Sequence, residues 1–370
     1  MNVYCTNRLI VASLGILDQS YSTGSISQGK DNDHNLVKDL RLDPKVSELL
    51  KKNTPAEKAF LAFEVNKATG NLLESPQWKN WAAFVVKRNN NNNPEGSLAS
   101  AMMIQFGVDK AFEILAAAAK IPKTKEVATK LKEAKINGWL SHGSRPDAIF
   151  EAMKLNQKID NFFDSPQFTT WAAFLKAVNE KNKNKKSISE LDVFKKFYEE
   201  DDLLKLLSSA DNIDNPRTQK YLDELATGWL DQPMHPQNVF NKLKLDEAVD
   251  DLLTKPWLSN WVEYMKKFNE QYPFAQTSMI KSFTKSYGDE KLAVMLQAAT
   301  KGSDAHTARI AKNLQQAQFK QWMIGKLNPD DVYKTVLKLD STSSPKAEIW
   351  RAFYNAYDTA FPGQLFSFKP

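Results

Sequence analysis

Paired carboxylates are the residues of this sequence whose spacing comes nearest to a catalytic pattern. Magnesium-dependent helical enzymes need carboxylates one helical turn apart, as in Asp-Asp-x-x-Asp. The three candidate pairs lack an acidic residue three positions further on: Asp201-Asp202, Asp250-Asp251 and Asp330-Asp331. Acidic residues near a helix start usually complement the helix dipole. These pairs therefore indicate helix N-termini rather than a metal site.

Other signatures of chemistry are missing from the sequence. It contains no His-Glu-x-x-His, Gly-x-Ser-x-Gly, P-loop or Gly-x-Gly-x-x-Gly string. The single Cys5 excludes a disulfide framework, and with only four histidines it also excludes a Cys/His zinc module. We therefore expect no catalytic, metal-binding or cofactor-binding residue, no cofactor, and a protein that is not an enzyme.

The composition is that of a folded, helix-rich protein. Of 370 residues, 42% are apolar and 25% charged, and only 13 are glycine. The net charge of +6 is a mild excess, which suits solubility better than nucleic-acid binding. No apolar run is long enough to span a bilayer. We expect neither nucleic acid nor membrane as partner, and a monomer when free.

Four tryptophans recur at a nearly constant spacing along the chain. Trp81, Trp171, Trp261 and Trp350 are separated by 90, 90 and 89 residues, and each lies five residues after a proline. Positions three, four and seven after each tryptophan are apolar, apart from Arg88, which predicts one buried helical face. Proline is favoured at the first helical position, so we expect the prolines of the repeat to open helices, including Pro146, Pro236 and Pro329, which follow the blocks described next.

Two further blocks keep phase with the tryptophans. Gly138-Trp139-Leu140 recurs 90 residues later as Gly228-Trp229-Leu230, with a third copy at Trp322-Met323. The predicted structural core comprises Trp81, Trp171, Trp261, Trp350, Phe106, Tyr198 and Tyr287. The predicted inter-unit joint comprises Trp139, Leu140, Trp229, Leu230, Trp322 and Met323. We expect the joint tryptophans to dock onto the preceding unit, Trp139 near Leu115 and Trp229 near Leu207.

This repeat phase predicts the organisation of the chain. A flexible leader covers residues 1–41 and includes an apolar stretch at Leu9–Leu17 that could be a signal segment. Four repeat units follow: 42–133, 134–223, 224–315 and a truncated 316–370. Polar loops begin eight residues after the first three tryptophans. One holds Lys181, Lys183, Lys185 and Lys186, which could be a solvated loop or a phosphate-binding or nuclear-import patch.

The tandem of a Gly-Trp-Leu block, a Trp-centred helix and a Tyr-centred helix resembles the LWY repeat of secreted RXLR-type effectors from Phytophthora and related oomycetes. The resemblance covers about Leu42 to Phe368. The Arg-X-Leu-Arg motif of the family has no match, and Asp39–Leu42 reads Asp-Leu-Arg-Leu. The first unit lacks a Gly-Trp-Leu block and would be the opening WY unit.

The resemblance implies an extended all-α solenoid of WY/LWY units of about 90 residues. It also implies secretion, entry into the cytoplasm and/or nucleus of a plant cell, and suppression of immunity by binding a host protein. Some such arrays capture the scaffold subunit of the type-2A serine/threonine phosphatase, which makes that subunit a candidate partner. The resemblance does not indicate which residues bind the partner.

A second interpretation is an intracellular helical-repeat adaptor of the tetratricopeptide or HEAT kind. Those repeats have periods of roughly 34 or 40–47 residues, so a 90-residue period argues against it. A third, a helical enzyme, needs a polar pocket with clustered carboxylates, for which the sequence offers no candidate.

Overall fold

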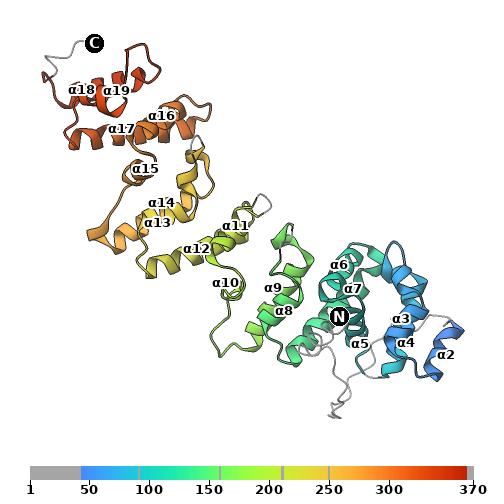
Figure 1. Cartoon of the computed structure of the whole chain (residues 1–370). Helices are drawn as coiled ribbons and strands as arrows, with labels where there is room; N and C mark the ends of the chain where they lie inside the picture. Colours follow the sequence, from blue (N-terminus) through green and yellow to red (C-terminus); the bar gives the residue numbers. More distant parts are fainter. Residues whose placement is uncertain (1–42, 91, 158–159, 210–211, 249–250, 365–370) are drawn as a thin grey trace, which may run out of the picture. The chain divides into compact units, whose positions relative to one another are not determined.

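The computed structural model describes residues 43–90, 92–157, 160–209, 212–248 and 251–364. Within these ranges the chain forms helices and turns without a β-strand (Figure 1). The described residues divide into two compact bodies, one up to Asn215 and one from Pro216 onward. The all-α repeat fold predicted above is thereby confirmed. The predicted leader, with its signal segment, lies outside the described residues. No helix in the described ranges is long and apolar enough to cross a membrane.

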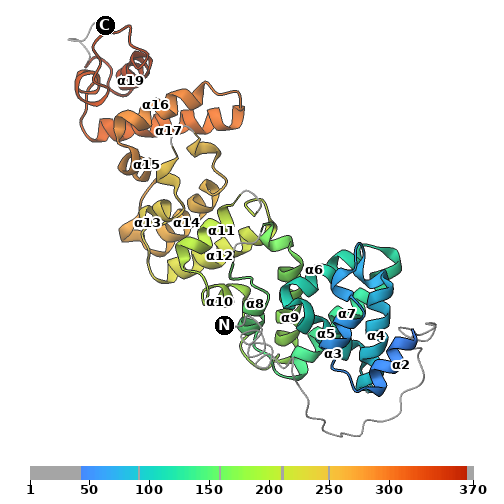
Figure 2. The ribbon, with the colours of Figure 1, turned by 45° about the vertical axis from the view of Figure 1, so that its right-hand side comes forward.

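The N-terminal body holds the first repeat, most of the second and the helix that joins them. Its helices are α2 (Pro44–Lys51), α3 (Ala56–Ala62), η1 (Val65–Lys67), η2 (Leu72–Glu74), α4 (Pro76–Asn89), α5 (Pro94–Phe106), α6 (Val108–Ala119), α7 (Pro122–Ser141), α8 (Pro146–Ala152), η3 (Phe162–Asp164), α9 (Pro166–Lys181), α10 (Glu190–Phe194) and α11 (Glu200–Ser208). Figures 1 and 2 show α5, α6 and α7 packed side by side.

The C-terminal body holds the rest of the second repeat, the third repeat and the fourth. Its helices are α12 (Pro216–Asp231), α13 (Pro236–Lys242), η4 (Leu245–Glu247), η5 (Leu252–Thr254), α14 (Leu258–Gln271), η6 (Pro273–Ala275), α15 (Met279–Tyr287), α16 (Asp289–Thr300), α17 (Ala305–Ile324), α18 (Pro329–Asp331), the π-helix η7 (Val332–Val336) and α19 (Ala347–Ala360).

Proline opens a tryptophan helix only in the first two repeats. Helices α4 and α9 begin at Pro76 and Pro166, where the preceding Ser75 and Ser165 accept hydrogen bonds from the backbone amides two residues after each proline, at 3.1 Å. Pro146, Pro236 and Pro329 also open helices, as predicted, at the start of α8, α13 and α18. The prediction was wrong for Pro256 and Pro345. Helices α14 and α19 begin two residues later, because each proline lies inside a tight turn closed by Leu258 N to Lys255 O and by Ala347 N to Ser344 O.

The four repeated tryptophans make the same two contacts in every repeat. Each packs edge-to-face on an aromatic ring of the preceding short helix, with centroids 4.9–5.4 Å apart; the pairs are Phe60–Trp81, Phe150–Trp171, Phe240–Trp261 and Tyr333–Trp350. Each indole Nε1 also donates to a backbone carbonyl at the start of that short helix; the acceptors are Ala56, Pro146, Pro236 and Pro329, at 2.7–3.2 Å. The tryptophan side chains are at most 6% exposed.

In the second and third repeats a tyrosine hydroxyl binds the other end of the segment that begins with this short helix. Tyr287 is the last residue of α15, whereas Tyr198 lies in the turn that follows α10. Tyr198 Oη donates to Leu155 O at 2.5 Å, and Tyr287 Oη donates to the equivalent carbonyl of Leu245. Burial raises the pKa of Tyr198 to about 12 and raises that of Tyr287 as well. Phe106 has no hydroxyl and instead packs edge-to-face on Phe60 at 5.3 Å. Tyr287 is buried, whereas Phe106 and Tyr198 are half-buried.

A single inserted residue explains the π-helix of the last repeat. The segment between the proline that opens the short helix and the next buried leucine is Pro146–Leu155 in the second repeat and Pro236–Leu245 in the third. In the fourth repeat it is Pro329–Leu339, which is one residue longer. A π-turn absorbs one extra residue inside a helix, and η7 lies in this segment. The insertion leaves Leu339 buried, like Leu155 and Leu245.

The predicted repeat boundaries fall inside helices rather than in linkers. The boundaries at 133/134, 223/224 and 315/316 lie within α7, α12 and α17. Gly138 and Gly228 of the Gly-Trp-Leu blocks are interior residues of α7 and α12. A joint between repeats is therefore a continuous helix, which ends one repeat and begins the next.

Replacing Gly138 with alanine should stabilise the N-terminal body by about 0.5–1 kcal/mol. A Cβ atom at this position would meet no atom within 4 Å, and alanine loses less backbone entropy than glycine in a helix. Urea denaturation of Gly138→Ala and of Gly143→Ala tests this. Gly143 has φ +66°, so alanine there should destabilise the body. An unchanged or lower midpoint for Gly138→Ala would contradict the assignment.

The joints between adjacent repeats as candidate functional site

Within the described residues no group of three or more His, Cys, Asp or Glu side chains is placed to hold a metal ion. A hollow of about 270 Å³ lies between α12, α13 and α14 of the C-terminal body. Buried Trp229 and Tyr264 line it together with the exposed side chains of Asp223, Glu263 and Lys267. The joints carry the more specific arrangement of side chains.

The first joint lies between the first and second repeats and is centred on Trp139 of α7. Its ring lies between Phe112 of α6 and Phe174 of α9, with centroids 5.6 and 5.5 Å away. Trp139 is 1% exposed, and Leu115 of α6 is buried as well. One tryptophan thus contacts the last helix of one repeat and the tryptophan helix of the next.

Two polar contacts cross the same joint. Lys154 Nζ lies 2.8 Å from Asp109 Oδ2, and Gln167 Nε2 donates to Glu113 Oε1 at 2.8 Å. Asp109 and Glu113 are one turn apart on α6, so both face the next repeat. Lys154 has φ +56°, in the left-handed region, at the end of the short segment after α8.

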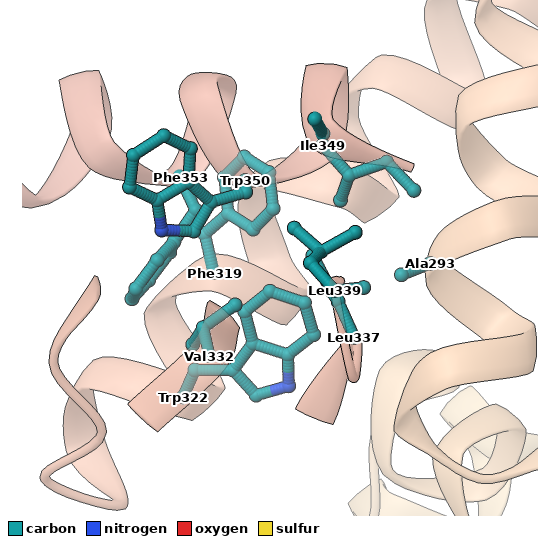
Figure 3. Close-up of a cluster of buried hydrophobic side chains, with 10 residues drawn as sticks. Ala293, Phe319, Trp322, Val332, Leu337, Leu339, Ile349, Trp350 and Phe353 are labelled. Atoms are coloured by element: carbon teal, nitrogen blue, oxygen red, sulfur yellow. The ribbon is translucent and has the colours of Figure 1, made fainter. Parts of the chain in front are cut away.

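A second joint within one body connects the third and fourth repeats. Figure 3 shows Phe319 and Trp322 of α17 facing Trp350 and Phe353 of α19 in one buried cluster, with Ala293 of α16 at its edge. The rings of Trp322 and Phe353 are 5.3 Å apart at 78°. Trp322 thus takes the place in this joint that Trp139 has in the first.

Polar contacts again cross this joint from the residues that follow the tyrosine helix. Glu290 of α16 lies 2.6 Å from Lys346 Nζ and 3.6 Å from Lys338 Nζ. Lys338 has φ +50°, which matches Lys154 of the first joint. Glu348 of α19 pairs with Lys301 at the end of α16. Both joints therefore combine a buried tryptophan with an acidic residue that binds a left-handed lysine.

Sequence reasoning missed these ion pairs, although the sequence carries a signal for them. An acidic residue occurs three positions after each aromatic of the tyrosine block, at Asp109, Asp201 and Glu290. The lysine recurs at Lys154, Lys244 and Lys338. Each directly precedes a buried leucine. Ion pairs do not follow a hydrophobic period, so the pattern that locates a helix face does not reveal them.

The remaining predicted joint residues lie on the same helices. Leu140, Leu230 and Met323 are half-buried. Trp229 is 4% exposed and packs on Tyr264 of α14, with ring centroids 6.2 Å apart. Its docking onto the preceding repeat stays a prediction.

The two joints described above differ in the hydrogen bonding of the buried indole Nε1 of their tryptophan. Trp322 Nε1 donates to Asp289 Oδ1 at 2.6 Å. Trp139 Nε1 is buried and has no hydrogen-bond partner among the described residues. Asp289 directly follows Gly288, the left-handed glycine that caps the tyrosine helix; after the equivalent Gly107 the residue is Val108. An unpaired buried donor costs about 1–3 kcal/mol, so the first joint is the less well satisfied of the two.

A buried lysine, Lys135, is a second difference between the two joints. It lies one turn before Trp139 on α7, is 3% exposed, and its Nζ lies 5.6 Å from the centroid of the Trp139 ring. Burial lowers the pKa of Lys135 to about 8. The equivalent position is Leu225 on α12 and Gln318 on α17. The first joint therefore contains a buried cation that the other joint helices lack.

Replacing Lys135 with leucine should stabilise the N-terminal body at pH 7, on the order of 2 kcal/mol. The folded-state pKa is below the unfolded value of 10.5, so the penalty is complete below pH 8 and disappears as the pH rises from about 8 to 10.5. Urea denaturation at pH 7 and pH 9.5 should show the advantage of Lys135→Leu shrinking at the higher pH. Lys125→Leu, at an exposed site on α7, is the control. An advantage that does not depend on pH would contradict the burial argument.

The chain is similar in sequence to known proteins. No protein-family model matches the chain. The chain is 32% identical over 327 residues to the RxLR effector protein PSR2 of Phytophthora sojae, which covers 85% of this chain and 48% of that protein. It is 29% identical over 325 residues to the RxLR effector protein PSR2 of Phytophthora infestans, covering 85% of this chain and 42% of that protein. The chain thus spans about half the length of these curated relatives.

A solved structure shares the fold. The crystal structure of PcRxLR12 is similar with a TM-score of 0.64 and 28% identity, over 88% of this chain and 79% of that chain. Repeated tryptophan and tyrosine helices joined by a buried Trp define an all-α protein of the WY-repeat class. The chain belongs to the RxLR effector family, as the repeat pattern predicted. RxLR effectors are secreted and translocated into host cells.

Proposed function

We propose that this chain acts inside a plant cell, in the cytoplasm and/or the nucleus, as a virulence effector that suppresses immunity by binding a host protein. In this proposal the chain catalyses no reaction. The observation that carries it is the repeated joint, in which buried tryptophan and ion pairs fix one repeat against the next within a chain of the RxLR effector family.

A fixed joint supports binding because it sets the geometry of surface residues on two repeats at once. Repeat proteins contact partners through surfaces shared by neighbouring repeats. Ordering such a surface before binding lowers the entropic cost of association. The first joint fixes α6 against α9 through Trp139, Lys154 and Gln167, so residues exposed on both helices can act as one surface.

The candidate partner is the scaffold subunit of the host type-2A serine/threonine phosphatase, which rests on the family resemblance. Calorimetric titration of the purified scaffold subunit into the full chain tests it, and we expect a Kd of about 1 µM or tighter. Serum albumin serves as the negative partner. Absence of heat and of co-elution at 50-fold higher concentration would contradict this choice of partner while leaving the family assignment in place.

A further inference from the structure

The loop between the tryptophan helix α9 and helix α10 is closed at its base by one asparagine. Asn179 Nδ2 donates to Ile188 O at 2.8 Å, and Ile188 N donates to Asn179 Oδ1 at 3.0 Å. Asn269, eight residues after Trp261, makes the same pair of bonds with Thr277, so the closure is a feature of the repeat. The base of the loop is therefore held by two hydrogen bonds that involve none of the lysines.

The tip of this loop is a cluster of lysines. Between the two ends of the closure the chain reads Glu-Lys-Asn-Lys-Asn-Lys-Lys-Ser, and all four lysines are exposed. Lys181 Nζ donates to Leu140 O, the end of α7, at 2.7 Å. Lys183, Lys185 and Lys186 make no ion pair with any described residue. The loops at the same place in the first and third repeats contain no lysine between Asn89 and Pro94 or between Asn269 and Pro273.

The positive charge is confined to this short segment. Glu180 precedes it, and Glu190 and Asp192 follow it. Nucleic-acid binding through the backbone needs a broader set of phosphate contacts, and sequence-tolerant binding of single strands adds stacking aromatic side chains, which the loop lacks. Polybasic membrane binding usually needs a second, apolar anchor. A receptor with separate acidic sites for individual lysines fits a short, exposed, lysine-rich segment best.

We propose that residues 181–186 form a nuclear-import motif, bound by the acidic groove of a host import adaptor that recognises lysine-rich segments. The inference rests on the proposed function in one respect, since import matters only to a chain that has entered a plant cell. It adds a second partner to that function, at a site that is separate from the joints.

Matched variants test the motif in the full chain. The loop variant is Lys183→Gln, Lys185→Gln and Lys186→Gln together. The control variant, Lys58→Gln, Lys79→Gln and Lys123→Gln, removes the same charge from exposed sites on α3, α4 and α7. Affinity for the purified import adaptor is measured by fluorescence anisotropy at 150 mM salt. Nuclear accumulation in leaf cells is measured on a fusion to a carrier too large to diffuse through nuclear pores.

The loop variant should bind the adaptor at least about tenfold more weakly and lose nuclear accumulation, while the control variant behaves like the wild type. Single-stranded RNA and vesicles containing anionic lipid are the alternative probes. Equal adaptor binding by loop variant and control, or a loop-specific loss of RNA or vesicle binding without adaptor binding, would overturn the proposal. Binding of the phosphatase scaffold is measured on the same variants, so failure of one proposal is distinguished from failure of the other.

Discussion

Replacing Trp171 with alanine should lower the free energy of unfolding of the N-terminal body by about 3–5 kcal/mol. The side chain is fully buried, packs on Phe150 at 5.0 Å and stacks on Phe194 at 5.9 Å. Its indole also satisfies the carbonyl of Pro146 at 2.8 Å, so alanine leaves both a cavity and an unpaired acceptor.

The loss should appear first in the second repeat. Because each repeat of such an array contacts mainly its neighbours, hydrogen exchange should accelerate in α8, α9 and α10 before it does in α3 and α4. Lys176→Ala, on the exposed side of α9, is the control and should change stability by less than about 0.5 kcal/mol. Rapid exchange around Trp171 in the wild type, or equal loss of protection in all repeats, would contradict the repeat organisation.

The second large effect is expected at the first joint. Trp139→Ala removes the ring that Phe112 and Phe174 both contact, at a cost of about 3–5 kcal/mol in the joint. The core contacts of Trp81 and Trp171 do not involve this side chain, so both repeats should stay folded while α7 and α9 separate.

Limited proteolysis and small-angle scattering detect this separation. Trp139→Ala should become sensitive to cleavage between Ser141 and Pro146 and should scatter as a more open particle. Leu140→Ala, at a half-buried neighbouring position, should change both readouts much less. Wild-type protease resistance and an unchanged scattering envelope for Trp139→Ala would show that the tryptophan does not hold the joint.

The sequence predicted the repeat because the buried tryptophans follow a fixed period. A residue that fills the core of every unit cannot be replaced by a small or polar one without a cavity, so its spacing survives in the sequence. The same reasoning predicted Trp139 and Trp322 at joints, where each contacts the next tryptophan helix.

The details that the sequence did not predict depend on geometry rather than on period. Gly138 is compatible with both a helix interior and a helix boundary, so its residue type does not indicate that α7 is continuous. The π-helix follows from one inserted residue, which becomes visible only when the short segments are compared at both ends. The pairing of Asp109 with Lys154 requires a left-handed lysine, a conformation that residue type alone does not indicate.

The asparagine closure illustrates a signal that was visible but could not be interpreted. Asn89, Asn179 and Asn269 all stand eight residues after a tryptophan. Asparagine is common in any polar loop, so the sequence alone does not indicate that Asn179 and Asn269 bind the far side of their loops, at Ile188 and Thr277.

Affinity capture from plant extract, with quantitative mass spectrometry, tests the central claim that the chain binds a host protein through a surface fixed by its joints. Wild type, Trp139→Ala and the control Lys176→Ala are compared, and each enriched plant protein is then purified and titrated against all three. We expect one host protein to bind wild type and Lys176→Ala equally and folded Trp139→Ala at least about tenfold more weakly. A partner that binds Trp139→Ala at full strength, or turnover of a substrate by the purified chain, would contradict the claim.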